Sequence, residues 1–510
     1  MQPESLAREL EKFLAEARSA VVLEEGAPLF DLATARYSVS GERGRCLLHL
    51  WSAERNAVRR VLGAERRPGR LRLSVQRFGQ KRPARLEVVL DRDPRAASAR
   101  RAARAAYRKL LERLLADRHA GWKLERFTSA MDLERSFGPV HARGLLRRGT
   151  SALAVVGCNA GETQAAVEAS VAVGILWLDH CRQQLAARAH VEALHLFVPP
   201  GRAETVRQRL AHLNREAARF QLFELDEPQA AMTEVDCADR GNLATRLVHC
   251  PDAAAAGECF AAAIARVRAS APEAEVAVLS GAEVAFRMHG LEFARARLGA
   301  QAGGFRPGQE IVFGLGAAET ALTDENAAQF EELVERMAAA RQPAGDRRHP
   351  LWRMHPERWL ESLVACDVEA LDPGLDPACV YSQVPAFAST DRAMIDVLGV
   401  TRGGRLAVIE LKADEDLQLP IQGLDYWARV AWHHERGEFH RFGYYGGREL
   451  SPAPPLLYLV APALHVHPAT DTLLRYMAPE IECTLVGVHE SWREGVRVIF
   501  RKRRTSAAGG

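Results

Sequence analysis

Three ionisable residues stand inside otherwise apolar, strand-like runs in the last third of the chain. Asp396 lies in the run MIDVLGV, and Glu410 and Lys412 end the run LAVIELK. Side chains two residues apart on a strand project to the same face, so Glu410 and Lys412 should lie side by side. The sequence RGGR between the runs signals a turn. A hairpin of the two strands would bring Asp396 to the same patch.

Charged side chains in an oily strand pair are costly unless they are paired or bind a metal. Two carboxylates suit a hard divalent cation such as Mg²⁺ or Mn²⁺, which prefers oxygen ligands and keeps several waters. A lysine beside that cation can orient or deprotonate an attacking water and stabilise the charge that develops on a phosphate. The three residues therefore predict metal-assisted hydrolysis of a phosphodiester, with a nucleic acid as the partner.

Two helices are expected to complete this patch. A helix starting near Leu419 would place Gln422 and Tyr426, four residues apart, on one face above the strands. The segment 351–368, LWRMHPERWLESLVACDV, is also expected to be helical and offers Glu361, with Glu357 as the second choice. The predicted order is thus helix, strand, turn, strand, helix.

This order resembles the PD-(D/E)xK, or restriction-endonuclease-like, nuclease superfamily. The matching parts are an Asp, a Glu-x-Lys fourteen residues later and a Gln-x-x-x-Tyr in the next helix, and they cover about residues 350–503. The proline that the family places before the first acid is absent, since Ile395 precedes Asp396. The resemblance implies a restriction-endonuclease-like domain in an α/β protein and a Mg²⁺- or Mn²⁺-dependent deoxyribonuclease activity.

The resemblance also implies a role for each matching residue. Asp396, Glu410 and the backbone carbonyl of Leu411 would hold the metal, and Lys412 would position the attacking water. Gln422 would orient Lys412 or the scissile phosphate. Tyr426 would support the helix, and Glu361 would complete the acidic site.

Other interpretations stay open. If Glu410 and Lys412 lay on an edge strand, they would form an ordinary solvated pair. Gln422 and Glu361 could likewise be solvated helix residues. A protein of another class, a non-catalytic nucleic-acid-binding or assembly scaffold, would not need the triad. An RNA-processing endonuclease on the same fold is a third possibility.

The segment 151–225 repeats the pattern of the nuclease-like stretch, which predicts a duplicated module. SALAVVGCNAGETQ matches RLAVIELKADEDLQ, and a helix, a strand ending in a Pro loop, a helix and a strand follow in both. The alignment sets Gly157 against Glu410, Asn159 against Lys412 and Arg143 against Asp396. The first copy is therefore expected to be a degenerate nuclease fold, unless it is an ordinary α/β unit.

Two basic stretches are candidate nucleic-acid contacts. The segment 93–119 is the clearest helix of the chain, capped by Asp93, and one of its faces carries Arg100, Arg101, Arg104 and Arg108. Further on, Arg287, Arg295 and Arg297 are interleaved with Phe286 and Phe293, as in some single-strand clamps, although an amphipathic helix with both aromatic rings in the core is the favoured interpretation.

Length and composition set the frame. The 510 residues, 47% of them hydrophobic, predict several domains of an ordinary globular protein, and a net charge of only +3 excludes a globally basic nucleic-acid coat. Nine cysteines without a Cys-x-x-Cys pair, no apolar run of membrane-spanning length and no secretory leader predict a cytoplasmic protein with no membrane partner. A homo-oligomer stays open.

The expected domains follow the changes in pattern along the chain. They are a helix plus β-rich region (1–90), the degenerate α/β module (91–245), a small α/β module (246–340), a linker (341–350), the nuclease-like domain (351–503) and a disordered tail (504–510).

Overall fold

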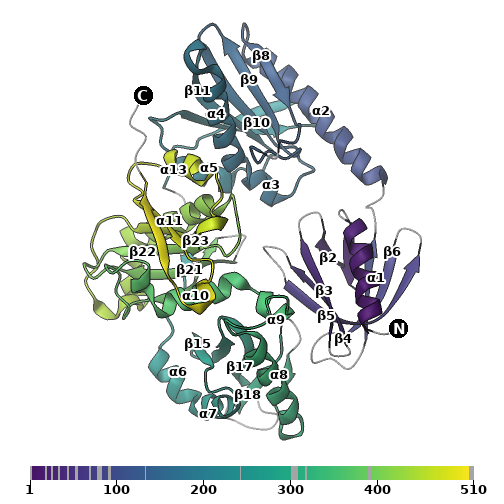
Figure 1. The fold of residues 1–510 in the computed structure, drawn as a ribbon. Coiled ribbons are helices and arrows are strands. Elements are labelled where there is room, and N and C mark those ends of the chain that lie inside the picture. Colours follow the sequence, from purple (N-terminus) through teal and green to yellow (C-terminus); the bar gives the residue numbers. More distant parts are fainter. Residues whose placement is uncertain are drawn as a thin grey trace. The chain divides into compact units, whose positions relative to one another are not determined.

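The protein is described by a computed structural model, which covers residues 3–504 except for breaks at 18–19, 25–26, 33–34, 43–44, 52–55, 68–69, 77–82, 90–93, 133, 242, 300–307, 316–318 and 389–391. The chain divides into two compact units. One combines residues 1–97 with 250–363, and the other combines 98–249 with 364–510. Figure 1 shows the helices and strands along the chain. The expected cap Asp93 and the tail residues 505–510 lie outside the described residues.

The first unit begins with helix α1 and an antiparallel sheet in the order β2-β1-β7-β6-β5-β4-β3. Leu10, Phe13 and Leu14 of α1 pack on Leu48 and Leu73 of the sheet. The arginine-rich stretch after Asn56 forms strand β5. The elements are α1 (Pro3–Glu16), β1 (Val21–Glu24), β2 (Ala27–Asp31), β3 (Arg36–Glu42), β4 (Arg45–Trp51), β5 (Asn56–Arg67), β6 (Arg70–Gln76) and β7 (Ala84–Val89).

The second part of this unit is a sheet in the order β15-β16-β17-β18-β19 with helices around it. The favoured amphipathic helix over Phe286 and Phe293 is wrong, because this stretch is the hairpin β16–β17; both rings are nevertheless in the core. The elements are α6 (Ala253–Cys259), α7 (Ala261–Ser270), β15 (Glu275–Ser280), β16 (Glu283–Met288), β17 (Leu291–Gly299), β18 (Gly308–Phe313), β19 (Thr320–Ala321), α8 (Ala327–Ala340), α9 (Pro350–Arg353) and α10 (Pro356–Cys366).

The segment 341–350, expected to be a linker, is tied into this part of the first unit. The buried Arg341 guanidinium donates hydrogen bonds to the carbonyl oxygens of Met288 (3.0 Å) and Leu351 (2.9 Å). Leu351 and Met354 also pack in the same apolar cluster as Phe286. The segment therefore acts as a packed connection within the unit.

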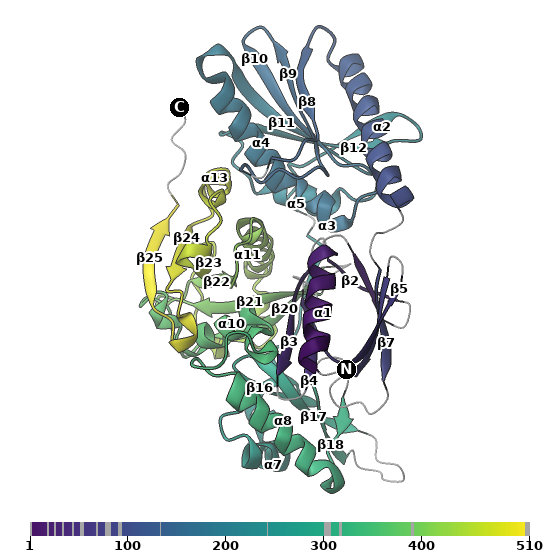
Figure 2. The ribbon, with the colours of Figure 1, turned by 45° about the vertical axis from the view of Figure 1, so that its right-hand side comes forward.

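The second unit contains two α/β modules. In the first, the sheet order is β8-β9-β10-β11-β12-β13, and α2 and α4 cover its two faces (Figure 2). The predicted helix over 93–119 is confirmed as α2. The elements are α2 (Pro94–Arg118), β8 (Lys123–Thr128), β9 (Ala142–Arg148), β10 (Ser151–Gly157), α3 (Gln164–Glu168), α4 (Ser170–Leu185), β11 (His190–Val198), α5 (Glu204–Ala211), β12 (Arg219–Asp226) and β13 (Ala231–Val235).

In the second module the sheet order is β14-β20-β21-β22-β23-β24-β25, and α11 packs on β22 and β23. The predicted strand, turn, strand and helix of residues 395–426 are present. The elements are β14 (Thr245–Leu247), β20 (Tyr381–Ala388), β21 (Arg392–Val400), β22 (Leu406–Leu411), α11 (Leu419–Glu435), α12 (Glu438–Arg441), β23 (Leu456–Pro462), α13 (Thr470–Arg475), β24 (Cys483–Val488) and β25 (Val498–Arg503).

The two modules share strand order and strand directions. From β8 to β13 the successive pairs are antiparallel, antiparallel, parallel, parallel and antiparallel, and the pairs from β20 to β25 follow the same series. β14 is an additional edge strand in the second module. The chain is thus a mixed α/β protein, and none of its described helices has both the length and the apolar character needed to cross a membrane.

Candidate functional site

Asp396 interrupts the hydrogen-bond ladder between two neighbouring strands. The antiparallel pairing of β21 and β22 ends at Val397 and Ile409, so the next step would set Asp396 opposite Glu410. At this point the Asp396 carboxylate accepts a hydrogen bond from the Leu411 backbone N–H, Oδ2 to N 3.0 Å. Because the side chain replaces a backbone partner, the carboxylate is held at the carboxyl end of β22.

Glu410 and Lys412 lie on the same face, as the two-residue period predicts. The Lys412 Nζ is 3.4 Å from Glu410 Oε1, and the side chains are 12% and 2% exposed. β22 lies between β21 and β23, with every residue from Leu406 to Leu411 buried. An edge-strand, solvated pair is therefore not what the structure contains. The pair is a recessed ion pair on a central strand.

Helix α11 brings two further side chains toward these carboxylates. Burial, and then the negative charges of Glu410 and Asp396, raise the pKa of Tyr426 well above its ordinary value. Its hydroxyl therefore keeps its proton and can donate a hydrogen bond. Gln422 lies one turn earlier, and its side-chain oxygen is buried and accepts no hydrogen bond from the described part of the chain.

An acidic loop and two histidines follow the strand ends next to Lys412. The His465 ring is 3.8 Å from Asp414 and 3.5 Å from Glu490, and the His467 ring is 3.8 Å from Glu415. Burial is the main cause that lowers the pKa of His467. We did not predict this pairing of histidines with acids, although the run Asp414-Glu415-Asp416, one residue after Glu-x-Lys, was a usable signal.

The residues fit a hard divalent cation that keeps most of its water. Asp396 and Glu410 offer carboxylate oxygens from adjacent strands, and Mg²⁺ is commonly held by one or two carboxylates. Within the described residues, no three His, Cys, Asp or Glu side chains gather to hold a metal ion between them. A fully protein-caged metal such as structural zinc does not fit this set.

Glu361 lies on α10 in the first compact unit, whereas Asp396, Glu410 and Lys412 belong to the second. The Glu361 side chain is buried and forms an ion pair with Arg358, NH1 to Oε2 3.1 Å. Its participation in the acidic site stays a prediction.

Three of the six candidate nucleic-acid contacts are engaged in ion pairs. Arg104 binds Glu162, with Nε to Oε1 2.6 Å, and Arg101 on the same helix is exposed. Arg295 pairs with Glu283 and Glu292, and Arg297 with Glu310 and Glu319. The side chain of Arg100 lies outside the described residues. Arg108 is half-buried on α2. The positive charge of Arg104, Arg295 and Arg297 is therefore compensated within the chain.

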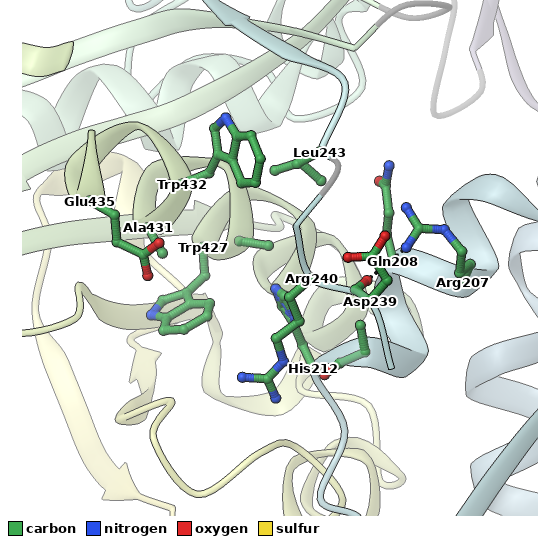
Figure 3. A pocket seen from close by; sticks show the side chains of 12 residues that line it. Arg207, Gln208, His212, Asp239, Arg240, Leu243, Trp427, Ala431, Trp432 and Glu435 are labelled. Carbon is green, nitrogen blue, oxygen red and sulfur yellow. Dashed lines mark hydrogen bonds between the residues drawn. The ribbon is translucent and has the colours of Figure 1, made fainter. Parts of the chain in front are cut away.

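A small pocket lies between α5 and α11 (Figure 3). The indoles of Trp427 and Trp432 face His212 and Arg240 across it, and its volume is about 90 Å³. This is room for only a few water molecules. A second, open pocket of about 1040 Å³ is lined by Arg182 and Tyr476, among others. Both are lined by residues other than Asp396, Glu410 and Lys412.

Another feature that sequence reasoning missed connects the two modules. Arg209 of α5 donates to Asp425 of α11, with Nε to Oδ1 3.0 Å and NH2 to Oδ2 2.8 Å. Asp425 directly precedes Tyr426 on the helix that also carries Gln422. No signal in the sequence links these residues, because they are far apart along the chain.

Compared with known proteins, the chain matches no protein-family model, no curated protein and no solved structure.

Proposed function

We propose that this chain is a metal-dependent nuclease that hydrolyses DNA phosphodiester bonds at a site built from Asp396, Glu410 and Lys412. The observation that carries the proposal is the recessed Glu410–Lys412 pair on the central strand β22, beside the Asp396 carboxylate. Well-packed apolar residues would often stabilise such a position as well as a buried ion pair does. The charges therefore point to chemistry rather than to stability.

The chemical roles follow from the positions of the side chains. Mg²⁺ or Mn²⁺ held by Asp396, Glu410 and the Leu411 carbonyl would supply Lewis-acid polarisation of a phosphate oxygen and of water. Lys412 is held by Glu410, and its ammonium can donate to the attacking water or stabilise negative charge in the transition state.

Two side chains of α11 would assist. The Gln422 oxygen is available to orient Lys412 or the water, and the protonated Tyr426 hydroxyl can donate toward the carboxylates. The resemblance to the PD-(D/E)xK superfamily supports the same assignment, including Glu361 as a further acid. The shared strand order of the two modules supports the prediction that the upstream module is a degenerate copy, kept for structure or for binding nucleic acid.

A cleavage assay on the full chain tests the proposal. End-labelled double-stranded DNA, single-stranded DNA and RNA are incubated with Mg²⁺, Mn²⁺ or a chelator. We expect metal-dependent cleavage of DNA that falls at least about 100-fold in Lys412→Ala, since one transition-state donor or proton-transfer group contributes about 10²–10⁴-fold. The exposed Lys123→Ala is the control and should cut at the wild-type rate. Equal cleavage by Lys412→Ala would reject this site.

One observation favours a second candidate, a non-catalytic nucleic-acid-binding scaffold. Glu410 is almost closed to solvent, and within the described residues no group of three metal ligands gathers. Nucleic-acid binding without any metal-dependent cleavage would support the scaffold. Cleavage of RNA in preference to DNA would instead support an RNA-processing enzyme on the same site.

A further inference from the structure

The structure allows the two modules of the second unit to be compared residue by residue. The Lys412 N–H donates to the Val460 carbonyl at 2.9 Å, just beyond the end of β22, and the Cys158 N–H donates to the Phe197 carbonyl at 2.9 Å, just beyond the end of β10. Cys158 therefore takes the place of Lys412. The crossover helices agree with this alignment.

In each crossover helix, a glycine packs on two leucines of the following strand. A Cβ at Gly423 would lie 2.5 Å from Leu459, and a Cβ at Gly174 would lie 2.9 Å from Leu196. Leu459 pairs with Glu410. Leu196 in turn pairs with Val156, so Val156 takes the place of Glu410.

This register corrects the alignment of Gly157 with Glu410 and of Asn159 with Lys412 by one residue. The hairpin between β9 and β10 is shorter than that between β21 and β22, and a one-residue slip moves every side chain to the other face of a strand. Arg143, which pairs with Val156, does take the place of Asp396. In neither alignment does the first copy carry an acid or a lysine at the positions of Asp396, Glu410 and Lys412.

Arg143 prevents the first copy from binding a metal cation at the position that Asp396 occupies in the second copy. Arg143 is 1% exposed, and its guanidinium donates to the Gly138 carbonyl at 2.8 Å and lies 4.6 Å from the Phe137 ring centre. With Val156 and Cys158 in place of the carboxylate and the ammonium, the site holds a positive charge where the second copy holds a negative one. It can hold neither a metal ion nor an activated water.

The two modules meet as the halves of a symmetric dimer would. The peptide segments just after α5 and α13 pair antiparallel, with Leu213 opposite Met477. The Asn214 N–H donates to the Tyr476 carbonyl at 2.8 Å, and the Ala478 N–H donates to the His212 carbonyl at 2.9 Å. The two donors, Asn214 and Ala478, are each the third residue after their helix. The two acceptors, His212 and Tyr476, are each the first residue after their helix, so the two hydrogen bonds join equivalent positions.

The helices around these paired segments make the same kind of reciprocal contact. α4 of the first module packs on α13 of the second, and α11 of the second packs on α5 of the first. In a two-fold dimer, residue i of one copy contacts j of the other and j contacts i. The contacts of this interface obey that rule with equivalent instead of identical residues.

We propose that the two modules form an internal pseudo-dimer with one cutting centre. The face through which such a module would pair with a second copy of this chain is covered by the degenerate module. One chain therefore acts as a monomer and cuts one strand of duplex DNA per encounter. The strand-cutting part rests on the proposed function, whereas the pseudo-dimer itself does not.

The test uses the full chain and three readouts. Light scattering should give the mass of a single chain, and supercoiled plasmid with Mg²⁺ should accumulate nicked circles before linear DNA appears. Leu213→Glu and Met477→Glu should each lower the unfolding midpoint by several degrees and by similar amounts, because the residues are equivalent. Leu464→Glu, at an exposed position, is the control and should leave the midpoint unchanged.

The outcomes separate the two proposals. A stable dimer, or unchanged midpoints in both Leu213→Glu and Met477→Glu, would overturn the pseudo-dimer whether or not the protein cuts DNA. Linear DNA formed without a nicked intermediate would overturn the single cutting centre. A protein that stays a monomer with both midpoints lowered but cuts nothing would retain the pseudo-dimer and reject the nuclease.

Discussion

Arg209 and Asp425 form a bidentate ion pair that joins the two modules of the second unit next to the candidate site. The side chains are 6% and 17% exposed, and Arg209 NH1 also donates to the Glu168 carbonyl at 2.8 Å. The equivalent positions on the other side of the pseudo-dyad, Leu473 and Leu176, are apolar and buried. Equivalent places in the interface are thus filled by an ion pair on one side and by two leucines on the other.

This asymmetry makes a prediction about stability. Arg209→Leu and Asp425→Leu should each lower the free energy of unfolding by about 3–5 kcal/mol, because each leaves a largely buried charge without its bidentate partner. The Glu168 carboxylate, 3.8 Å from Arg209 NH2, is too distant to replace the hydrogen bonds of Asp425. The double variant should recover most of the loss, because well-packed apolar residues often replace a buried pair at little cost. Urea unfolding of the four proteins measures the coupling, and additive losses would contradict it.

A second prediction concerns the metal. Asp396→Asn and Glu410→Gln keep the shape of the side chains but remove the negative charge that a hard cation needs. Each should weaken Mn²⁺ binding at least tenfold in titration calorimetry and reduce cleavage in parallel. Glu112→Gln, at an exposed position on α2, is the matched control and should bind like the wild type. Unchanged Mn²⁺ binding in both site variants would place the metal elsewhere.

The crossover glycines give a paired prediction. Gly423→Ala and Gly174→Ala would both press a methyl group against leucines at under 3.0 Å and should each cost about 1–3 kcal/mol. Only Gly423→Ala should also reduce cleavage, since Gln422 and Tyr426 are on the same helix. Gly257→Ala, on α6 with nothing within 4 Å of the new methyl, should leave stability unchanged or slightly raised. Equal loss of cleavage in both crossover variants would argue against a single active copy.

Acid should destabilise the fold through buried histidines. Burial lowers the pKa of His141 to about 4, and it lowers the pKa of His212 to about 4 as well. Between this value and the ordinary 6.5 the unfolded chain binds more protons than the folded one, so stability is complete above about pH 6.5 and falls as the pH approaches 4. Each ring should contribute about 3 kcal/mol to this loss.

Urea unfolding between pH 4 and 7 measures the acid sensitivity. His141→Gln should flatten the profile because it removes one titrating ring while keeping a group that can donate to the Ala166 carbonyl, which lies 2.8 Å from the ring. A replacement of the exposed His190 by Gln should leave the profile as it is. An unchanged profile in His141→Gln would show that this ring does not cause the loss.

The core of the candidate site was predictable because its signals are local. Strand period fixes that Glu410 and Lys412 share a face, and helix period fixes that Gln422 and Tyr426 do. The register of the first copy was not predictable, because the identical letters LAV at 153 and 406 fall on opposite faces once the hairpin lengths differ. Identity over three residues therefore does not determine which face of the sheet each side chain occupies.

The hairpin β16–β17 shows a different kind of error. Arg295 and Arg297 alternate with Ala294 and Ala296, which is a strand period, but alanine and arginine are also good helix formers and favoured the wrong interpretation. The pairing of residues 1–97 with 250–363 into one unit lay beyond local signals altogether, since it depends on contacts between distant segments.

The edge strand β14 has a consequence for how the protein is made. Thr245–Leu247 pairs with β20, and Thr245 Oγ1 also contacts His433 Nε2 at 3.1 Å, yet the whole segment 250–363 intervenes in the chain. During synthesis, the backbone groups of β14 that bond to β20 stay unpaired until β20 has left the ribosome. A fragment starting at residue 351 would lack this strand and would expose the unpaired edge of β20. The fragment should therefore aggregate under conditions in which the intact protein does not.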